Sequence, residues 1–181
     1  MLDQIPALLG VVVGVGASYL ATSLGDRRRA HREQAAKLDH TRQEAYAAYG
    51  RAVKDYVVLS ARIVASRGVG NGREQPLDPA IGLPQLAELE ATRTAVWEMV
   101  LLLGDTETIA AAREWHRCAW YLEWFARGEV AGDQEWDQAR AEASAARDRF
   151  YACARRSLHV LDPLPEPLPA PAWMLPRSEP L

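Results

Sequence analysis

The chain has 181 residues, which is enough for one domain with terminal extensions. Its mean hydropathy is only −0.22 although 49% of its residues are apolar, so apolar and polar residues are segregated along the chain. The net charge of −3 is uneven: residues 26–66 hold nine Lys or Arg and five Asp or Glu, whereas residues 67–181 hold twelve and eighteen. Two cysteines exclude a disulfide scaffold, and the acidic distal part repels phosphate, which argues against nucleic-acid binding.

An uncharged run of 20 residues extends from Ile5 to Leu24. A helix of this length spans ~30 Å, the thickness of the hydrocarbon core of a bilayer, so we predict a transmembrane anchor in residues 1–25. A basic cluster follows: Arg27, Arg28, Arg29 and Arg32. By the positive-inside rule this cluster stays in the cytoplasm, where it can contact anionic headgroups. We therefore expect a single-pass protein of the cell membrane, with a short N-terminus outside and a cytoplasmic C-terminal domain.

Two alternatives to a membrane span are disfavoured. A cleaved signal peptide carries its positive charge before the apolar run, and here the charge comes after it. A buried core helix rarely has twenty uncharged residues closed by three arginines. The segment Val11–Gly16 also resembles a dinucleotide-binding turn, but Tyr19 stands where the third glycine is needed and no alternating strands and helices follow.

Small residues recur at four-residue spacing within the predicted span. Gly10, Gly14 and Ser18 form one such stripe. This spacing allows two helix backbones to approach closely, so the stripe is a candidate packing site between two spans.

No proline interrupts residues 26–66, and apolar or small residues recur there at alternating intervals of three and four, with Arg42 at the one break. This is heptad spacing, which predicts one long helix that continues the membrane helix and is compatible with a coiled coil. We expect residues 26–44 to form a charged stalk and the remainder to enter a bundle. The heptad positions are Ala35, Leu38, Ala45, Tyr49, Ala52, Tyr56, Leu59 and Ile63.

The rest of the chain predicts three further helices. Glycines and prolines make residues 67–84 a loop, either a plain connector or a binding loop. Helices are expected over about 84–103, 106–127 and 133–160, with Asp105 and Asp133 as N-caps. Helices of similar length joined by short connections predict an all-α fold, with an antiparallel four-helix bundle over residues 45–160.

The C-terminal segment 161–181 holds seven of the eleven prolines. Alternating prolines from Pro163 to Pro171 favour an extended polyproline conformation, followed by an apolar tip around Trp173. The tail is either disordered or a docking peptide that binds a partner or the bundle itself.

These features together carry a resemblance. The N-terminal span, the arginine cluster, the long charged helix with Ala-Tyr repeats, Leu-Leu-Leu-Gly-Asp at 101–105 and an Ala-rich helix bearing Trp115 resemble single-span membrane proteins of high-GC actinobacteria that have a cytoplasmic helical domain. The resemblance covers most of residues 5–160. It implies no activity and no catalytic residues.

The helix expected over 106–127 has two distinct faces. At about 100° per residue, Ala111, Trp115, Cys118, Leu122 and Phe125 share one face, which we expect in the core. Tryptophan and arginine dominate contact hot spots, so the opposite face is a candidate interaction surface unless neighbouring helices or the tail cover it. That face consists of Arg113, Arg117, Trp120, Trp124 and Arg127.

The sequence holds no recognisable chemical site. Glu114 and Cys118 are one helical turn apart, but His116 points elsewhere, so we expect no metal site and no cofactor. No nucleophile with a base and no phosphate loop stands out, so we do not expect an enzyme. Glu88, Glu90 and Glu98 fit a solvated face, and Cys118 and Cys153 fit small buried residues.

The function expected from these features is that of a membrane-anchored protein-interaction module, an adaptor or assembly factor. Its expected partners are the lipid bilayer and either a protein or a second copy of the chain. One alternative is a homo-oligomeric structural or sensor component, built on the span and on the heptads of residues 35–63. The other is a small-ligand receptor that uses the bundle core or the 67–84 loop.

Overall fold

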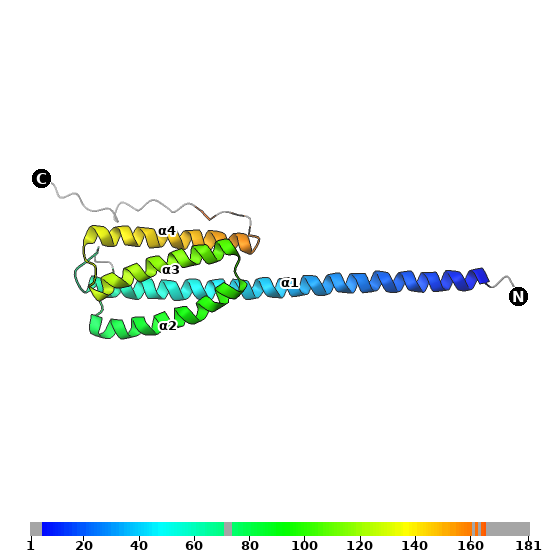
Figure 1. Cartoon of the computed structure of the whole chain (residues 1–181), viewed down its shortest axis with the longest axis horizontal. Coiled ribbons are helices and arrows are strands. Elements are labelled where there is room, and N and C mark those ends of the chain that lie inside the picture. The colour runs from blue at the N-terminus through cyan, green and yellow to red at the C-terminus, as the bar shows by residue number, and fades with distance from the viewer. Residues whose placement is uncertain (1–4, 71–73, 161, 163, 166–181) are drawn as a thin grey trace.

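The computed structural model describes the backbone of residues 5–70, 74–160, 162 and 164–165, and the side chains of residue 29 and of residues 33 onward within these ranges. This part of the chain consists of four helices and contains no strand, which confirms the expected all-α class. The C-terminal part of α1 packs with the other three helices as a helical bundle, and its N-terminal part projects away (Figure 1). The helices are α1 (Ile5–Ala65), α2 (Pro79–Leu103), α3 (Thr106–Arg127) and α4 (Asp133–Ser157).

Helix α1 is continuous over 61 residues, or ~92 Å. Among the residues whose side chains are described, no helix is both long and apolar enough to cross a membrane. The predicted span Ile5–Leu24 and most of the basic cluster lie outside that set, although their backbone belongs to α1. Within the cluster only Arg29 is described; its side chain is exposed and pairs with Glu33 at 3.0 Å.

The heptad positions of α1 divide into two groups. Those from Ala45 to Ile63 are buried inside the bundle of a single chain, whereas Ala35 is exposed and Leu38 keeps 43% of its surface exposed. The buried positions therefore cannot also form a coiled coil with a second chain while the bundle is folded. The expectation that residues 35–63 supply a homo-oligomeric interface stays a prediction, and in the folded bundle exposed positions such as Ala35 and Leu38 are the ones accessible to a second chain.

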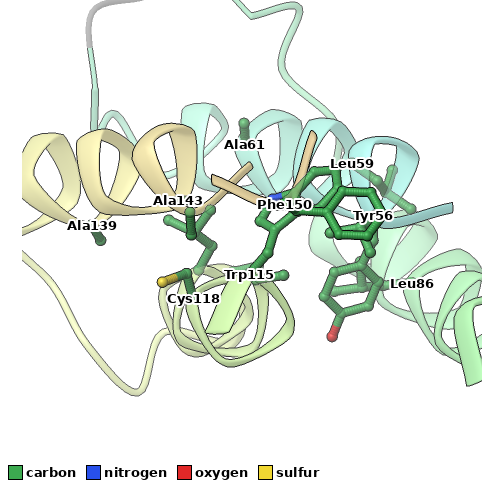
Figure 2. Close-up of a cluster of buried hydrophobic side chains, with 14 of the residues drawn as sticks. Tyr56, Leu59, Ala61, Leu86, Trp115, Cys118, Ala139, Ala143 and Phe150 are labelled. Atoms are coloured by element: carbon green, nitrogen blue, oxygen red, sulfur yellow. The ribbon is translucent and has the colours of Figure 1, made fainter. Parts of the chain in front are cut away.

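Aromatic side chains from three helices meet in the centre of the bundle. Tyr49 of α1 is fully buried, and its hydroxyl donates to the carbonyl oxygen of Ala112 at 2.8 Å. Its ring lies 5.2 Å from that of Phe150 and 6.1 Å from that of Trp115, measured between centroids. Figure 2 shows Trp115 and Phe150 meeting in this cluster, with Ala143 of α4 facing α3. The small alanines of α4 allow its backbone to lie close to α3.

Helix α2 begins at Pro79 rather than at Pro84, which corrects the expected loop of residues 67–84. Asp78 supplies the N-cap, because its carboxylate accepts from the amide of Ala80 at 2.8 Å. Proline at the first helical position is compatible with this start. Gly82 is buried against Ile63 of α1, so packing between α1 and α2 favours a helical conformation for the residues that precede Pro84. Pro84 itself lies in the second turn of α2.

The predicted caps of α3 and α4 have different outcomes. Asp105 caps α3 as expected, accepting from the amide of Thr108 at 2.7 Å, and Gly128 ends the helix in the left-handed conformation with a φ of 80°. Asp133 does not cap α4, because Gly132 occupies the cap position. The carboxylate of Asp133 instead accepts from the amide of Gly70 at 2.9 Å, which ties the first interhelical loop to α4.

Candidate functional site

The predicted interaction surface lies on the exposed side of α3. Trp120 and Trp124 keep 45% and 49% of their surfaces exposed, although α3 has neighbours in the bundle. The predicted core face of the same helix is buried at every position except Ala111, which is partly buried. All five predicted surface residues are exposed: Arg113, Arg117, Trp120, Trp124 and Arg127. We call this set the α3 surface.

Trp120 is exposed but held in place by polar contacts. Its indole nitrogen donates to the carboxylate of Glu90 on α2 at 3.2 Å. The guanidinium of Arg93 lies 5.3 Å from the ring centroid, within the range of a cation–π interaction. The imidazole of His116 meets the ring edge-on, with centroids 4.3 Å apart. Because α2 fixes one side of the indole, the other side is presented to solvent in a defined orientation.

A fully buried arginine lies behind Trp120. Arg93 has no exposed surface and forms an ion pair with Glu90, and its guanidinium lies 5.4 Å from the ring centroid of Tyr56 on α1. It also contacts the imidazole of His116. Burying a guanidinium is costly unless it is paired, so the carboxylate and the aromatic rings are what make this position tolerable. We call Tyr56, Glu90, Arg93, His116 and Trp120 the Arg93 cluster.

Sequence reasoning missed this cluster. It assigned Glu90 to a solvated face and did not single out Arg93. A signal was nevertheless present, since Leu86, Arg93 and Val100 follow one another at intervals of seven, and all three are completely buried. A lone arginine in the register of an apolar stripe indicates a buried, paired charge.

The charges of the Arg93 cluster shift the pKa values of its members. Burial and the neighbouring guanidinium lower the pKa of His116 to about 4, against a smaller opposite effect of Glu90, so the imidazole is neutral at pH 7. Burial alone would raise the pKa of Glu90, but the hydrogen bonds and charge of Arg93 outweigh it and the pKa is lowered. Burial and the hydrogen bond to Glu123 raise the pKa of Tyr56, which stays protonated. At neutral pH the cluster therefore holds one cation and one anion in direct contact.

Two hollows flank the α3 surface. The larger, of about 420 Å³, lies between α3 and α4, and the smaller, of about 340 Å³, lies between α2 and α3. Both include Arg117 and Trp120, so these two side chains form the ridge that separates them. The ring of Tyr121 meets that of Trp124 edge-on at 5.7 Å and extends the aromatic wall of the larger hollow. We call this larger hollow the α3/α4 groove.

Two arginines of the α3 surface are oriented by acidic neighbours on the same helix. Arg117 pairs with Glu114 at 2.7 Å, and Arg127 pairs with Glu123. Both pairs have helical spacing; the pair of Arg117 is largely exposed and is worth only a few tenths of a kcal/mol, whereas Glu123 in the other pair is mostly buried. Their effect is to hold guanidinium groups beside the indoles. The surface therefore offers flat aromatic rings and cationic donors, a combination suited to binding protein segments and not to acid–base chemistry.

Cysteine and metal chemistry gain no support in the described part of the chain. Cys118 and Cys153 are both free thiols there, and burial raises the pKa of Cys118, which keeps its sulfur protonated. No group of three His, Cys, Asp or Glu side chains among the described residues is arranged to hold a metal ion.

No protein-family model, curated protein or solved structure matches this chain. The resemblance to actinobacterial single-span membrane proteins therefore depends on the sequence features alone.

Proposed function

We propose that this chain is a membrane-anchored protein-interaction module that binds a partner protein through the α3 surface. One observation carries the proposal: Trp120 is fixed from behind by the Arg93 cluster while almost half of it stays in water. A side chain that is rigid before binding loses little conformational entropy when a partner covers it. Trp124 and Tyr121 extend the same aromatic surface along α3.

The exposed indoles are large enough to anchor a complex. A tryptophan presents roughly 250 Å², so the exposed parts of Trp120 and Trp124 amount to about 235 Å². At ~25 cal/mol per Å², covering both would contribute about 6 kcal/mol. Hot-spot residues in known interfaces contribute 2 kcal/mol or more each, so this pair has the size of an interface centre.

The proposed scaffold is an antiparallel four-helix bundle carried by a single transmembrane helix. Contacts at the two ends of the bundle support the helix directions: Arg42 donates to the carbonyl oxygen of Leu103 at 2.9 Å, and the hydroxyls of Tyr46 and Ser157 are 3.0 Å apart. At the other end, the amide of Leu77 donates to the carbonyl oxygen of Arg62 at 3.0 Å. The ends of α2 and α4 therefore lie where α1 enters the bundle.

The anchoring part of the proposal is supported by the apolar run Ile5–Leu24 and the arginines that follow it. Full-length protein and a version that starts at Asp26 are expressed in parallel, and their membrane and soluble fractions are compared after a high-salt wash. We expect the full-length protein in the membrane fraction and the shorter version in the soluble fraction, because salt weakens headgroup contacts but leaves a spanning helix in place. Equal distribution of the two would rule out an anchor in this run.

The interaction surface is tested by site-specific photo-crosslinking in cells. A photoreactive amino acid replaces Trp124 in the full-length protein, and a matched control replaces Leu102, which is also exposed and apolar but lies on α2. We expect a discrete adduct from position 124 and none from position 102. Adding Trp120→Ala should reduce the adduct about thirtyfold, which corresponds to a loss of ~2 kcal/mol.

Three results of this experiment are informative. Identical products from positions 124 and 102 would show that α3 has no special role. If the adduct formed equally well in the presence of Trp120→Ala, the indole of Trp120 would not be part of the interface. An adduct only with a second copy of the chain would replace the adaptor with the homo-oligomeric alternative. Circular dichroism of the purified variants controls for loss of the fold.

A further inference from the structure

The chain turns back on itself where α4 ends. His159 adopts the left-handed conformation with a φ of 58°, and the amide of Val160 donates to the carbonyl oxygen of Arg155 at 2.9 Å. The guanidinium of Arg155 then donates to the carbonyl oxygen of Asp162, also at 2.9 Å. A side chain on the last turns of α4 thus binds the backbone seven residues later. The backbone at Asp162 is therefore held beside the last turns of α4.

The position of Arg155 selects one side of α4. At about 100° per residue, Ser144 lies only about 20° from Arg155 around the helix, whereas Glu142 lies about 140° away. Ser144 lines a hollow of about 250 Å³ between α1 and α4, and Glu142 lines the α3/α4 groove on the other side. Arg155 therefore holds Asp162 on the side of α4 that faces the hollow between α1 and α4, which we call the α1/α4 groove.

The α1/α4 groove has an apolar floor and a cationic rim. Its floor includes Val57, Ala61, Ala143 and Trp115, and Val58 keeps 48% of its surface exposed. The rim carries three cationic side chains and one acidic side chain, Glu74, which pairs with Arg140 at 2.9 Å. The cations are Lys54, Arg140 and Arg147.

We propose that the α1/α4 groove is the docking site of this chain's own proline-rich segment, residues 163–171. A polyproline helix needs no backbone hydrogen-bond partner, so it can lie between two helices whose own backbone groups are already paired. Its conformation is largely fixed by the prolines, so docking costs little further entropy. The segment is directly continuous with the turn that Arg155 holds.

The lengths of the groove and the segment agree. A polyproline helix rises ~3.1 Å per residue and an α-helix 1.5 Å, so four residues of tail cover the same ~12 Å as eight residues of α4. Starting from Asp162 beside Arg155, this places Glu166 level with Arg147 and Leu168 level with Ala143, next to Ser144. Glu166 is the only charged residue between Asp162 and Arg177, and it arrives at the cationic rim. Spacing and charge therefore point to the same register.

The register is tested by disulfide trapping in the full-length protein with Cys118 and Cys153 replaced by alanine. Leu168→Cys is combined either with Ser144→Cys in the α1/α4 groove or with Glu142→Cys in the α3/α4 groove. Under mild oxidation we expect an intramolecular disulfide in the first pair at a yield at least tenfold above the second. A preference for Glu142→Cys, a disulfide between two chains or no disulfide in either pair would each overturn the proposal.

A second measurement does not depend on oxidation. Val58→Cys is labelled with a maleimide in the full-length protein and in a version that ends at Asp162, with Leu102→Cys as the control outside the groove. Removing the tail should accelerate labelling at position 58 about tenfold and leave position 102 unchanged. Equal rates at position 58 would show that the tail does not cover the groove. Both tests are independent of the proposed partner surface on α3, which lies on another side of the bundle.

Discussion

The ion pair between Glu90 and Arg93 predicts opposite effects for two single substitutions. Glu90→Gln keeps a hydrogen-bond acceptor for Trp120 but leaves a completely buried guanidinium without its counter-charge. Removing one partner of a buried pair costs about 3–5 kcal/mol. The side chain of Glu90 is 32% exposed, so water can partly compensate and we expect a loss of about 2–3 kcal/mol.

Arg93→Met should change the free energy of unfolding much less than Glu90→Gln. An apolar side chain of similar length fills the space between Leu86 and Val100, and the freed carboxylate of Glu90 can turn toward water. Replacing a buried charge by a well-packed apolar residue is often neutral or stabilising, so we expect a change within about 1 kcal/mol.

The two variants are compared by thermal unfolding of the full-length protein in mild detergent, with near-ultraviolet circular dichroism as the signal that monitors unfolding. Glu90→Gln should lower the Tm by roughly 10 °C and Arg93→Met by less than about 4 °C. Glu88→Gln, an exposed acidic residue on the same helix, is the control and should change little. If Arg93→Met were the more damaging of the two, the cation would be a net stabilising element and the reasoning from desolvation would be refuted.

Three further predictions concern stability, each measured by chemical denaturation of the full-length protein. The pKa of His116 is lowered to about 4 in the folded state, so between about pH 6.5 and 4 the unfolded state binds one proton more than the folded state. The free energy of unfolding should therefore fall by about 1–2 kcal/mol as the pH is lowered through this window, less than ~1.4 kcal/mol per pKa unit because the ring is partly exposed. His116→Gln should lose this pH dependence, and an unchanged slope would contradict the assignment. Asp105→Ala should cost about 1 kcal/mol because α3 loses its N-cap, while Asp105→Asn should cost much less, and equal losses would show that the cap is not the cause. Gly82→Ala should cost about 1–3 kcal/mol, because its Cβ would lie 2.5 Å from Cγ1 of the buried Ile63, and a neutral result would mean that α1 and α2 can separate freely.

Local signals in the sequence were sufficient to predict α3 and its two faces. Asp105 and Gly128 bound the helix because a side-chain cap and a left-handed glycine are strong local signals. The alternation of core and surface residues along α3 follows directly from helical periodicity. The exposed positions of Trp120 and Trp124 followed from the same wheel, without any knowledge of the neighbouring helices.

Other features depend on contacts between helices, which a single helical pattern does not contain. The start of α2 was misplaced because Pro79 and Pro84 are equally acceptable near a helix start, and only the packing of Gly82 on α1 separates them. The heptads of α1 specify an apolar stripe but not whether its partner is another chain or the same one. The Arg93 cluster joins α1, α2 and α3, so no single helix reveals it.

The continuity of α1 connects the proposed anchor with the proposed interaction surface. The same helix contributes Tyr49 and Tyr56 to the core and projects from the bundle without a break, so the projecting part and the bundle cannot rotate independently. From Leu24 to Tyr46 the helix rises ~33 Å, and α3 adds ~22 Å between Asp105 and Trp120. Under the proposed anchoring, Trp120 stands about 55 Å from the end of the apolar run. A partner must therefore present its binding segment at that height, which favours a membrane protein with its own cytoplasmic domain over one that ends at the bilayer surface.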